Sequence, residues 1–265
     1  NILTYTTHPD VTRAIALLAK EAGAGRIVLV EGWGPQVWEE NAYSDLIEEL
    51  GAETVDLDDP SPEEDFSRVP VPKPLALPFL WLHKVLTQAD VFISVPKMKC
   101  HASAGITLSI KNVFGCTPLP RYRERPSEQY RSLMHKGHWP ERLPKILVDV
   151  LQARPVDFCL IDGISTIDQG EGPWNDRTPG IDIRTVRPGL LVAGRNPVAV
   201  DAVGTALMGF EPTAPAYHEP FPSGLNHIAL AAELGPGSHR LEEIEVRGLS
   251  IEEGRFPFTS CPRLS

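Results

Sequence analysis

The hydrophobic positions of this chain follow a helical spacing in some segments and form continuous strand-like runs in others. Residues 7–25 place apolar side chains at helical spacing, with Pro9 suited to a first helical turn, and the apolar run "RIVLVEG" that follows is typical of a buried strand. Residues 37–59 and 77–96 repeat this helix and strand unit. Successive units of this kind predict an α/β fold with a mainly parallel sheet and helices on both faces.

The second half of the chain continues the alternation. Residues 145–165 read as a helix and a strand, residues 187–210 as a strand and a helix, residues 223–235 as a helix and residues 241–252 as an edge strand. The segment "SAGITLSIKNVFG", residues 103–115, follows the strand at the end of residues 77–96 and is predicted to be a helix. All of these elements fit one α/β domain that covers residues 1–265.

Two stretches do not carry a regular pattern. Residues near 58–76 are rich in proline and acid, and residues 117–144 are rich in arginine and histidine. Both are too long for ordinary connections, and long loops in α/β proteins often serve as lids or interaction surfaces. We therefore expect long loops to cover a crevice at the carboxyl ends of the strands.

The charge and cysteine content narrow the classes of function. A net charge of -10 argues against a nucleic-acid or membrane-surface partner, and no stretch approaches the roughly 20 apolar residues of a membrane span. The first residues lack the regions of a signal peptide, which predicts a cytoplasmic location. The four cysteines include no C-x-x-C pair, which weakens zinc-ribbon and ferredoxin interpretations. They are Cys100, Cys116, Cys159 and Cys261.

Ligands of open parallel sheets bind beyond the carboxyl ends of the strands, so the residues there are the first candidates for a site. After the first strand, Gly32 and Gly34 in "EGWGP" would let the backbone approach a ligand closely. Their spacing is not that of a dinucleotide-binding loop, and a plain strand-to-helix turn is the alternative.

The strongest concentration of positive charge follows the third strand, in "PKMKCH". Lys97, Lys99 and His101 point the same way if the backbone is extended. Like charges held together repel, and an anionic ligand explains them more simply than several acidic partners do. Lys111 and Asn112 are predicted to lie on the helix that follows, where they bind the same ligand or simply end the helix.

Two acidic segments complete the candidate site. Asp162 and Glu171 lie in "LIDGISTIDQGEGP", where Asp162 closes a buried strand and needs a cation or a cluster of donors. Asp201 lies inside a helix that Asn196 is expected to cap, and we predict that Asp201 pairs with a lysine of "PKMK".

His101 is the first candidate for a general acid or base, or for a metal ligand together with Cys116. His135 and His138 are expected in a solvated, mobile loop.

Several of these motifs resemble one family. "VPKMKCHASAGITLSIKNVFGC", "TTHPDV", "AETVDLDD", "DFCLIDGISTIDQGEGP" and "GRNPVAVDAVGTALMGF" are similar, in the same order, to motifs of the domain of unknown function 362 family. The resemblance implies an α/β domain that often accompanies iron-sulfur modules and is sometimes described as a redox protein. The chain departs from that family in lacking a ferredoxin-like cysteine cluster and in having Cys100 where the family has a threonine.

The leading hypothesis is an enzyme, an oxidoreductase or an isomerase, with a crevice that binds a small carboxylate or phosphate. Lys97, Lys99 and Lys111 would hold the anion and Asn112 would orient it. His101 would move a proton together with Asp162 or Glu171, and a metal ion or an iron-sulfur cluster on Cys116 and His101 is compatible with this site.

Two alternatives belong to other classes. One is a non-catalytic redox partner or carrier subunit that docks an acidic protein through the arginines of residues 121–142. The other is a nucleotide-binding protein that uses "EGWGP", although this segment has neither the Walker nor the Rossmann spacing.

Overall fold

The computed structural model describes residues 4–32, 42–59, 61–172, 181–235 and 237–263. Its elements in chain order are α1 (Pro9–Glu21), β1 (Val28–Glu31), α3 (Ser44–Leu50), β2 (Glu53–Asp56), η2 (Glu63–Asp65), β3 (Phe66–Pro70), β4 (Phe79–His83), α4 (Lys84–Gln88), β5 (Ile93–Ser94), β6 (Lys99–His101), β7 (Gly105–Thr107), α5 (Ser109–Asn112), η3 (Val113–Cys116), α6 (Leu119–Tyr122), α7 (Trp139–Ala153), β8 (Phe158–Gly163), β9 (Thr166–Asp168), β10 (Arg184–Val186), β11 (Leu190–Gly194), α8 (Pro197–Leu207), α9 (His227–Leu234), η5 (Leu241–Glu243) and α10 (Ile251–Gly254).

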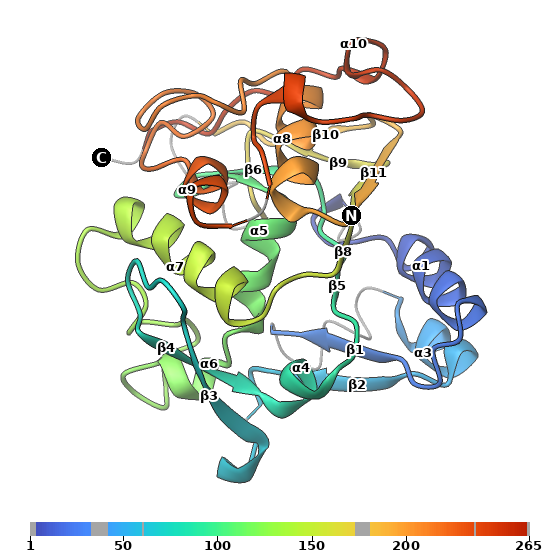
Figure 1. The fold of residues 1–265 in the computed structure, drawn as a ribbon, viewed down its shortest axis with the longest axis vertical. Coiled ribbons are helices and arrows are strands. Elements are labelled where there is room, and N and C mark those ends of the chain that lie inside the picture. The colour runs from blue at the N-terminus through green and yellow to red at the C-terminus, as the bar shows by residue number, and fades with distance from the viewer. Residues whose placement is uncertain (1–3, 33–41, 60, 173–180, 236, 264–265) are drawn as a thin grey trace.

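The strands form several small sheets in a mixed α/β arrangement (Figure 1). β1 pairs with β2 in parallel, and β8 lies between a parallel β5 and an antiparallel β11. The remaining pairs, β3 with β4, β6 with β7 and β9 with β10, are antiparallel. The α/β class is therefore confirmed, but the prediction of a mainly parallel sheet with helices on both faces is wrong for the described residues. β5 is only two residues long, and Pro96 beyond it cannot donate a backbone hydrogen bond.

The helices whose ends carry clear signals lie where the sequence predicts them. Pro9 stands in the first turn of α1, and Gly51 ends α3 with a left-handed φ of 56°. The Asn196 side chain caps α8 by accepting a hydrogen bond from the Ala199 amide at 3.0 Å. Helical spacing of apolar residues together with local end signals was enough to predict these helices.

Four predicted elements differ in the structure. Residues 58–76 were expected to be irregular, but β3 in this stretch pairs with β4 in an antiparallel hairpin. The helix predicted at the start of residues 77–96 is shorter than expected, because Phe79–His83 form β4 and only Lys84–Gln88 form α4. Residues 103–115 contain β7 before the short helix α5, because β7 pairs with β6 and draws this segment into an extended conformation. Residues 241–252 form no strand and instead contain η5 and the start of α10, whose capping box on Ser250 favours a helical turn.

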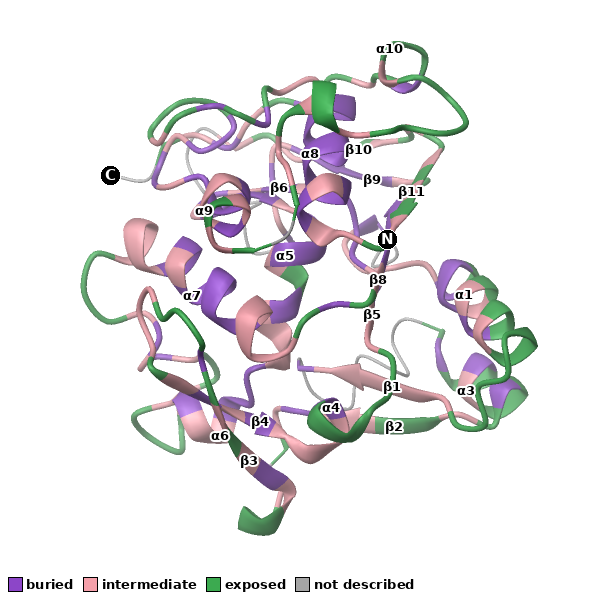
Figure 2. Cartoon of the chain, viewed as in Figure 1, coloured by how far each residue is buried: buried purple, intermediate pink, exposed green. Residues whose placement is uncertain are grey.

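The interior is divided between a large hydrophobic cluster and a smaller one (Figure 2). The large cluster packs α5, α7, α8 and α9 around β8, and Ile146, Ile161 and Phe221 lie at its centre without exposed surface. The smaller cluster, which includes Leu46 and Leu50, holds α1 against α3. The β6 and β7 hairpin and α5 lie on the large cluster, which gives the charged side chains of the site a rigid support. In the described part of the chain, no helix is long and apolar enough to span a membrane.

Candidate functional site

Lys97 and Asp162 form a buried ion pair at the end of the central strands. The Lys97 Nζ lies 2.6 Å from the Asp162 Oδ2 and 3.0 Å from the Ser165 carbonyl oxygen, and Lys97 is only 4% exposed. Asp162 also accepts hydrogen bonds from the His8 amide at 2.8 Å and from the Ile164 amide at 3.1 Å. Desolvation lowers the pKa of Lys97, and Asp162 opposes that shift. These two residues therefore tie the strand ends together, and Lys97 already has its counter-ion.

Among the described residues, Lys99 and Lys111 are the lysines of the site that form no ion pair with a carboxylate. The Lys99 ammonium donates to the backbone carbonyls of Tyr5 at 2.8 Å and of Glu171 at 2.9 Å. The Lys111 ammonium makes no hydrogen bond or ion pair among the described residues, and it lies 5.1 Å from the centre of the Phe114 ring. Desolvation lowers the pKa of each lysine to about 8, and repulsion by Lys111 adds to the shift of Lys99.

His101 and Glu171 lie beside each other in the candidate site. The His101 Nδ1 lies 3.0 Å from the Glu171 Oε2, and both side chains are mostly buried. The amides of Ser103 and Ala104 also donate to this nitrogen at 3.1 Å, and the Ala102 amide donates to Glu171 at 3.2 Å. An Nδ1 that accepts from these amides carries no proton of its own, whereas a proton on Nδ1 would point to Glu171 and displace the amide hydrogen bonds. The distance is short enough for the two groups to exchange a proton.

Glu171 is expected to control the protonation of His101. Desolvation lowers the pKa of His101, and the charge of Glu171 partly restores it. The substitution Glu171→Gln should therefore move the pKa of His101 further down, as measured by the pH titration of its ring proton signals in NMR spectra. Glu141→Gln, at a partly exposed side chain in the first turn of α7, is the control and should leave the pKa of His101 unchanged. An unchanged pKa of His101 in Glu171→Gln would contradict the pairing.

His227 is a site residue for which the sequence offered no partner. It lies fully buried at the start of α9, its ring meets Phe221 edge-on at 5.6 Å, and neither ring nitrogen has a hydrogen-bond partner among the described residues. A backbone group of Ala104 lies nearby without completing a hydrogen bond. Desolvation, reinforced by Lys111 and His101, lowers the pKa of His227 to about 3. His227 therefore stands beside the cationic residues as a neutral imidazole.

Asp201 does not pair with a lysine, so that prediction is wrong. Its carboxylate accepts hydrogen bonds from the backbone amides of Ser109 and Ile110, each at 2.8 Å. Desolvation raises the pKa of Asp201 to about 7, although these amides oppose the shift. Asp201 on α8 satisfies the first amides of α5, and it thereby orients the helix that carries Lys111.

The two turns around the site approach each other closely. A side chain at Gly32 would collide with the Gly115 carbonyl oxygen and would lie 2.7 Å from the Arg131 guanidinium, so only glycine fits there. Asn112 is exposed, and its side-chain Nδ2 donates to the Ser94 hydroxyl at 3.1 Å. Gly34 lies outside the described residues.

The predicted metal ligands His101 and Cys116 are held by different neighbours. His101 contacts Glu171, whereas desolvation, reinforced by Glu31, raises the pKa of Cys116 to about 12. A protonated thiol is a poor metal ligand, because metals bind the thiolate. No group of three or more His, Cys, Asp and Glu residues in the described ranges is arranged to hold a metal ion. The described donor set does not fit an iron-sulfur or metal centre.

The arginine-rich loop is packed onto the body of the protein. Arg131 pairs with Asp58 at 2.8 Å, and Arg121 pairs with Glu63. The His135 ring stacks on Trp139 with 3.6 Å between ring centres, so the solvated position expected for His135 is wrong.

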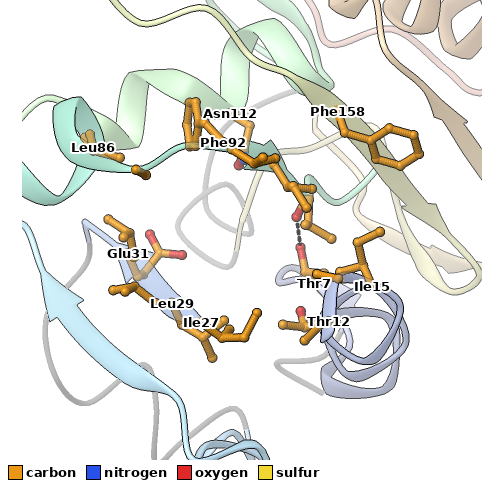
Figure 3. Close-up of a pocket in the computed structure, with 18 of the residues that line it drawn as sticks. Thr7, Thr12, Ile15, Ile27, Leu29, Glu31, Leu86, Phe92, Asn112 and Phe158 are labelled. Atoms are coloured by element: carbon orange, nitrogen blue, oxygen red, sulfur yellow. Dashed lines mark hydrogen bonds between the residues drawn. The ribbon is translucent and has the colours of Figure 1, made fainter. Parts of the chain in front are cut away.

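A cavity of about 1310 Å³ opens beside the lysines, between β1, α1 and the segment around β5 (Figure 3). Lys99, Asn112 and Cys116 line it, and Glu31 reaches it from the end of β1. The Thr7 hydroxyl, which donates to the Val95 carbonyl at 2.6 Å, lies at its wall. Lys111, His101 and Glu171 do not line this cavity, and neither do residues 58–76 or 117–144. The cavity therefore adjoins Lys99, and the predicted strand-end crevice covered by long loops stays a prediction.

The fold and the site define an α/β protein with a lysine-lined crevice. Residues 2–206 match the model of the domain of unknown function family DUF362, and the chain belongs to this family, as its motifs predicted. It is also 31% identical over 264 residues to the "Thylakoid-associated protein sll1697" of Synechocystis sp. (strain ATCC 27184 / PCC 6803 / Kazusa). That match covers 97% of this chain and 72% of the relative.

Proposed function

We propose that the protein binds a small carboxylate or phosphate between Lys99 and Lys111 and exchanges a proton with it through His101 and Glu171. The single observation that carries this proposal is the half-buried Lys111 side chain, whose ammonium has no hydrogen bond or ion pair among the described residues. A cation partly withdrawn from water without a partner is unfavourable, and a bound anion would reduce that cost.

The neighbours of Lys111 include one acid, Glu171, whose charge partly offsets the effect of desolvation on the pKa of Lys111, whereas Arg131 acts in the opposite sense. Glu171 already lies beside the His101 Nδ1 and accepts from the Ala102 amide, and Lys99, among the described residues, donates only to carbonyl oxygens. A bound anion would therefore still meet an excess of positive charge. His227, neutral at physiological pH, can donate one further hydrogen bond to a ligand without adding charge.

Proton transfer is the chemistry that the remaining groups supply. The His101 Nδ1 and the Glu171 Oε2 lie 3.0 Å apart, close enough to exchange a proton, which suits abstraction or return of a proton next to a bound carboxylate. An isomerase-type reaction therefore has more support than the docking of an acidic protein, because Arg121 and Arg131 of the arginine-rich loop already pair with Glu63 and Asp58. The cytoplasmic location predicted from the sequence remains a proposal.

Anion affinity tests the site directly. Lys111→Met should weaken the binding of inorganic phosphate and of acetate by about 10- to 150-fold, since a hydrogen bond to a charged group contributes roughly 1.5–3 kcal/mol. Isothermal titration calorimetry measures the effect, and Lys99→Met should act in the same direction. Lys136→Met, which removes an exposed lysine of the surface pair with Glu124, is the matched control.

The pH dependence provides a second readout in the same titrations. Both lysines lose their charge as the pH rises above about 8, so affinity should fall there in the unaltered protein. An affinity that is unaffected by Lys99→Met and Lys111→Met, or an absence of anion binding, would refute the proposal.

A further inference from the structure

We infer that the ligand carries an apolar chain attached to its anionic group, and that this chain fills the cavity between β1, α1 and β5. The inference rests on the proposed function, because it takes the anionic group to lie at Lys99 and asks what the rest of the ligand is. The chemical class is that of a medium-chain carboxylate or alkyl phosphate.

The body of the cavity is apolar. Leu29 and Phe92 lie on opposite sides of it, and Ile15 of α1 closes a third side (Figure 3). Among the described strands, β1 pairs only with β2 and β5 only with β8, so the lining strands do not close the space between them. A phosphate or acetate ion alone would leave these apolar walls in contact with water, which is unfavourable.

Charged side chains are found toward the two ends of the cavity. Arg26 and Asp90 precede β1 and β5, whereas Glu31 is the last residue of β1 and Lys97 and Lys99 follow β5. This distribution places a charged group at the strand ends and an apolar body between the strands. The cavity, at about 1310 Å³, exceeds the roughly 300–1,000 Å³ typical of small-ligand sites, so it has room for a chain.

The polar end offers more than one group to an anion. Lys99 and Thr107 are direct neighbours across the β6 and β7 hairpin, and both line the cavity. The Thr107 Oγ1 is buried without a hydrogen-bond partner among the described residues. An anionic headgroup at this end would accept from the Thr107 hydroxyl and contact the Lys99 ammonium. Glu31 is also at this end, and desolvation raises its pKa and so favours the neutral carboxyl beside an anion.

Chain length is the decisive variable in the test. Calorimetric titration of the full chain with acetate, hexanoate and decanoate should show affinity rising by about fourfold for each added methylene. Leu29→Trp should fill the body of the cavity and abolish this dependence while acetate still binds. Leu191→Trp, the same substitution at an exposed position of β11, should leave the dependence intact. Decyltrimethylammonium tests the headgroup and should bind far more weakly than decanoate.

The outcomes separate this inference from the proposed function. Equal affinities for acetate and decanoate, both weakened by Lys99→Met, would overturn the apolar chain but keep the anion site. Equal losses of decanoate affinity in Leu29→Trp and Leu191→Trp, or decyltrimethylammonium binding as tightly as decanoate, would likewise overturn the inference. If no carboxylate binds in a way that depends on Lys99 or Lys111, the proposed function itself fails.

Discussion

Lys97→Met is expected to lower the free energy of unfolding by about 3–5 kcal/mol, because it leaves the Asp162 carboxylate buried without its cation. Lys97 and Asp162 lie 2.6 Å apart, and their side chains are 3% and 0% exposed. The amides of His8 and Ile164 would still donate to Asp162, but they carry no full charge to offset it. Equilibrium unfolding in urea, followed by circular dichroism, measures the loss.

Two further variants test whether the loss of stability arises from a buried unpaired charge. Adding Asp162→Asn to Lys97→Met should recover part of the lost stability, since no charge then remains unpaired. Arg26→Met breaks an ion pair with Glu53 whose side chains are 65% and 57% exposed, and it should cost less than about 1 kcal/mol. If Lys97→Met and Arg26→Met cost the same, the pair does not hold the strand ends together.

Asp201→Ala should be the second strongly destabilising change. It removes the acceptor of the buried amides of Ser109 and Ile110, and each unpaired buried amide costs about 1–3 kcal/mol. The combined loss is therefore expected to be roughly 2–6 kcal/mol in urea unfolding. Asp10→Ala, at an exposed carboxylate in the first turn of α1, is the control and should change the stability far less.

The loss caused by Asp201→Ala should also depend on pH. The folded state raises the pKa of Asp201 from 3.8 to about 7, so the folded protein binds this proton more tightly than the unfolded chain does. The stability that this proton contributes is complete below about pH 4 and is lost as the pH rises to about 7. Asp201→Ala should therefore cost more at pH 5 than at pH 8. A loss that stays constant over this range would mean that Asp201 is charged throughout.

The cationic site could be located from local sequence but not assembled from it. If "PKMKCH" is extended, Lys99 and His101 point the same way, and Lys111 follows about ten residues later in the same segment. The sequence therefore predicted that these three side chains lie near one another. The pairing of Lys97 with Asp162 joins residues 65 positions apart and excludes the predicted partner Asp201. Which carboxylate reaches a lysine depends on strand pairing, because β8 brings Asp162 beside Lys97 in a parallel bridge.

His227 is a second residue whose neighbours could not be predicted from local sequence. Its sequence surroundings are those of an ordinary helix with Asn226 as the cap, and the sequence offers His227 only as one of several possible ligands that have no partner at helical spacing. It reaches the neighbourhood of Lys111 and His101 because α9 packs against α7 and α8 in the large hydrophobic cluster. A buried histidine without hydrogen-bond partners can be recognised only when the surrounding atoms are known.

The sequence by itself determined the α/β class, the helices with clear caps, the family and the cluster of lysines near His101. These properties depend on periodicity, capping and motif order, which are local. Only the tertiary structure decided that the strands form small sheets, that Lys97 is neutralised while Lys111 is not, and that a large apolar cavity lies beside Lys99. Those outcomes depend on contacts between distant segments, whose burial sets both the charge balance and the pKa of each group.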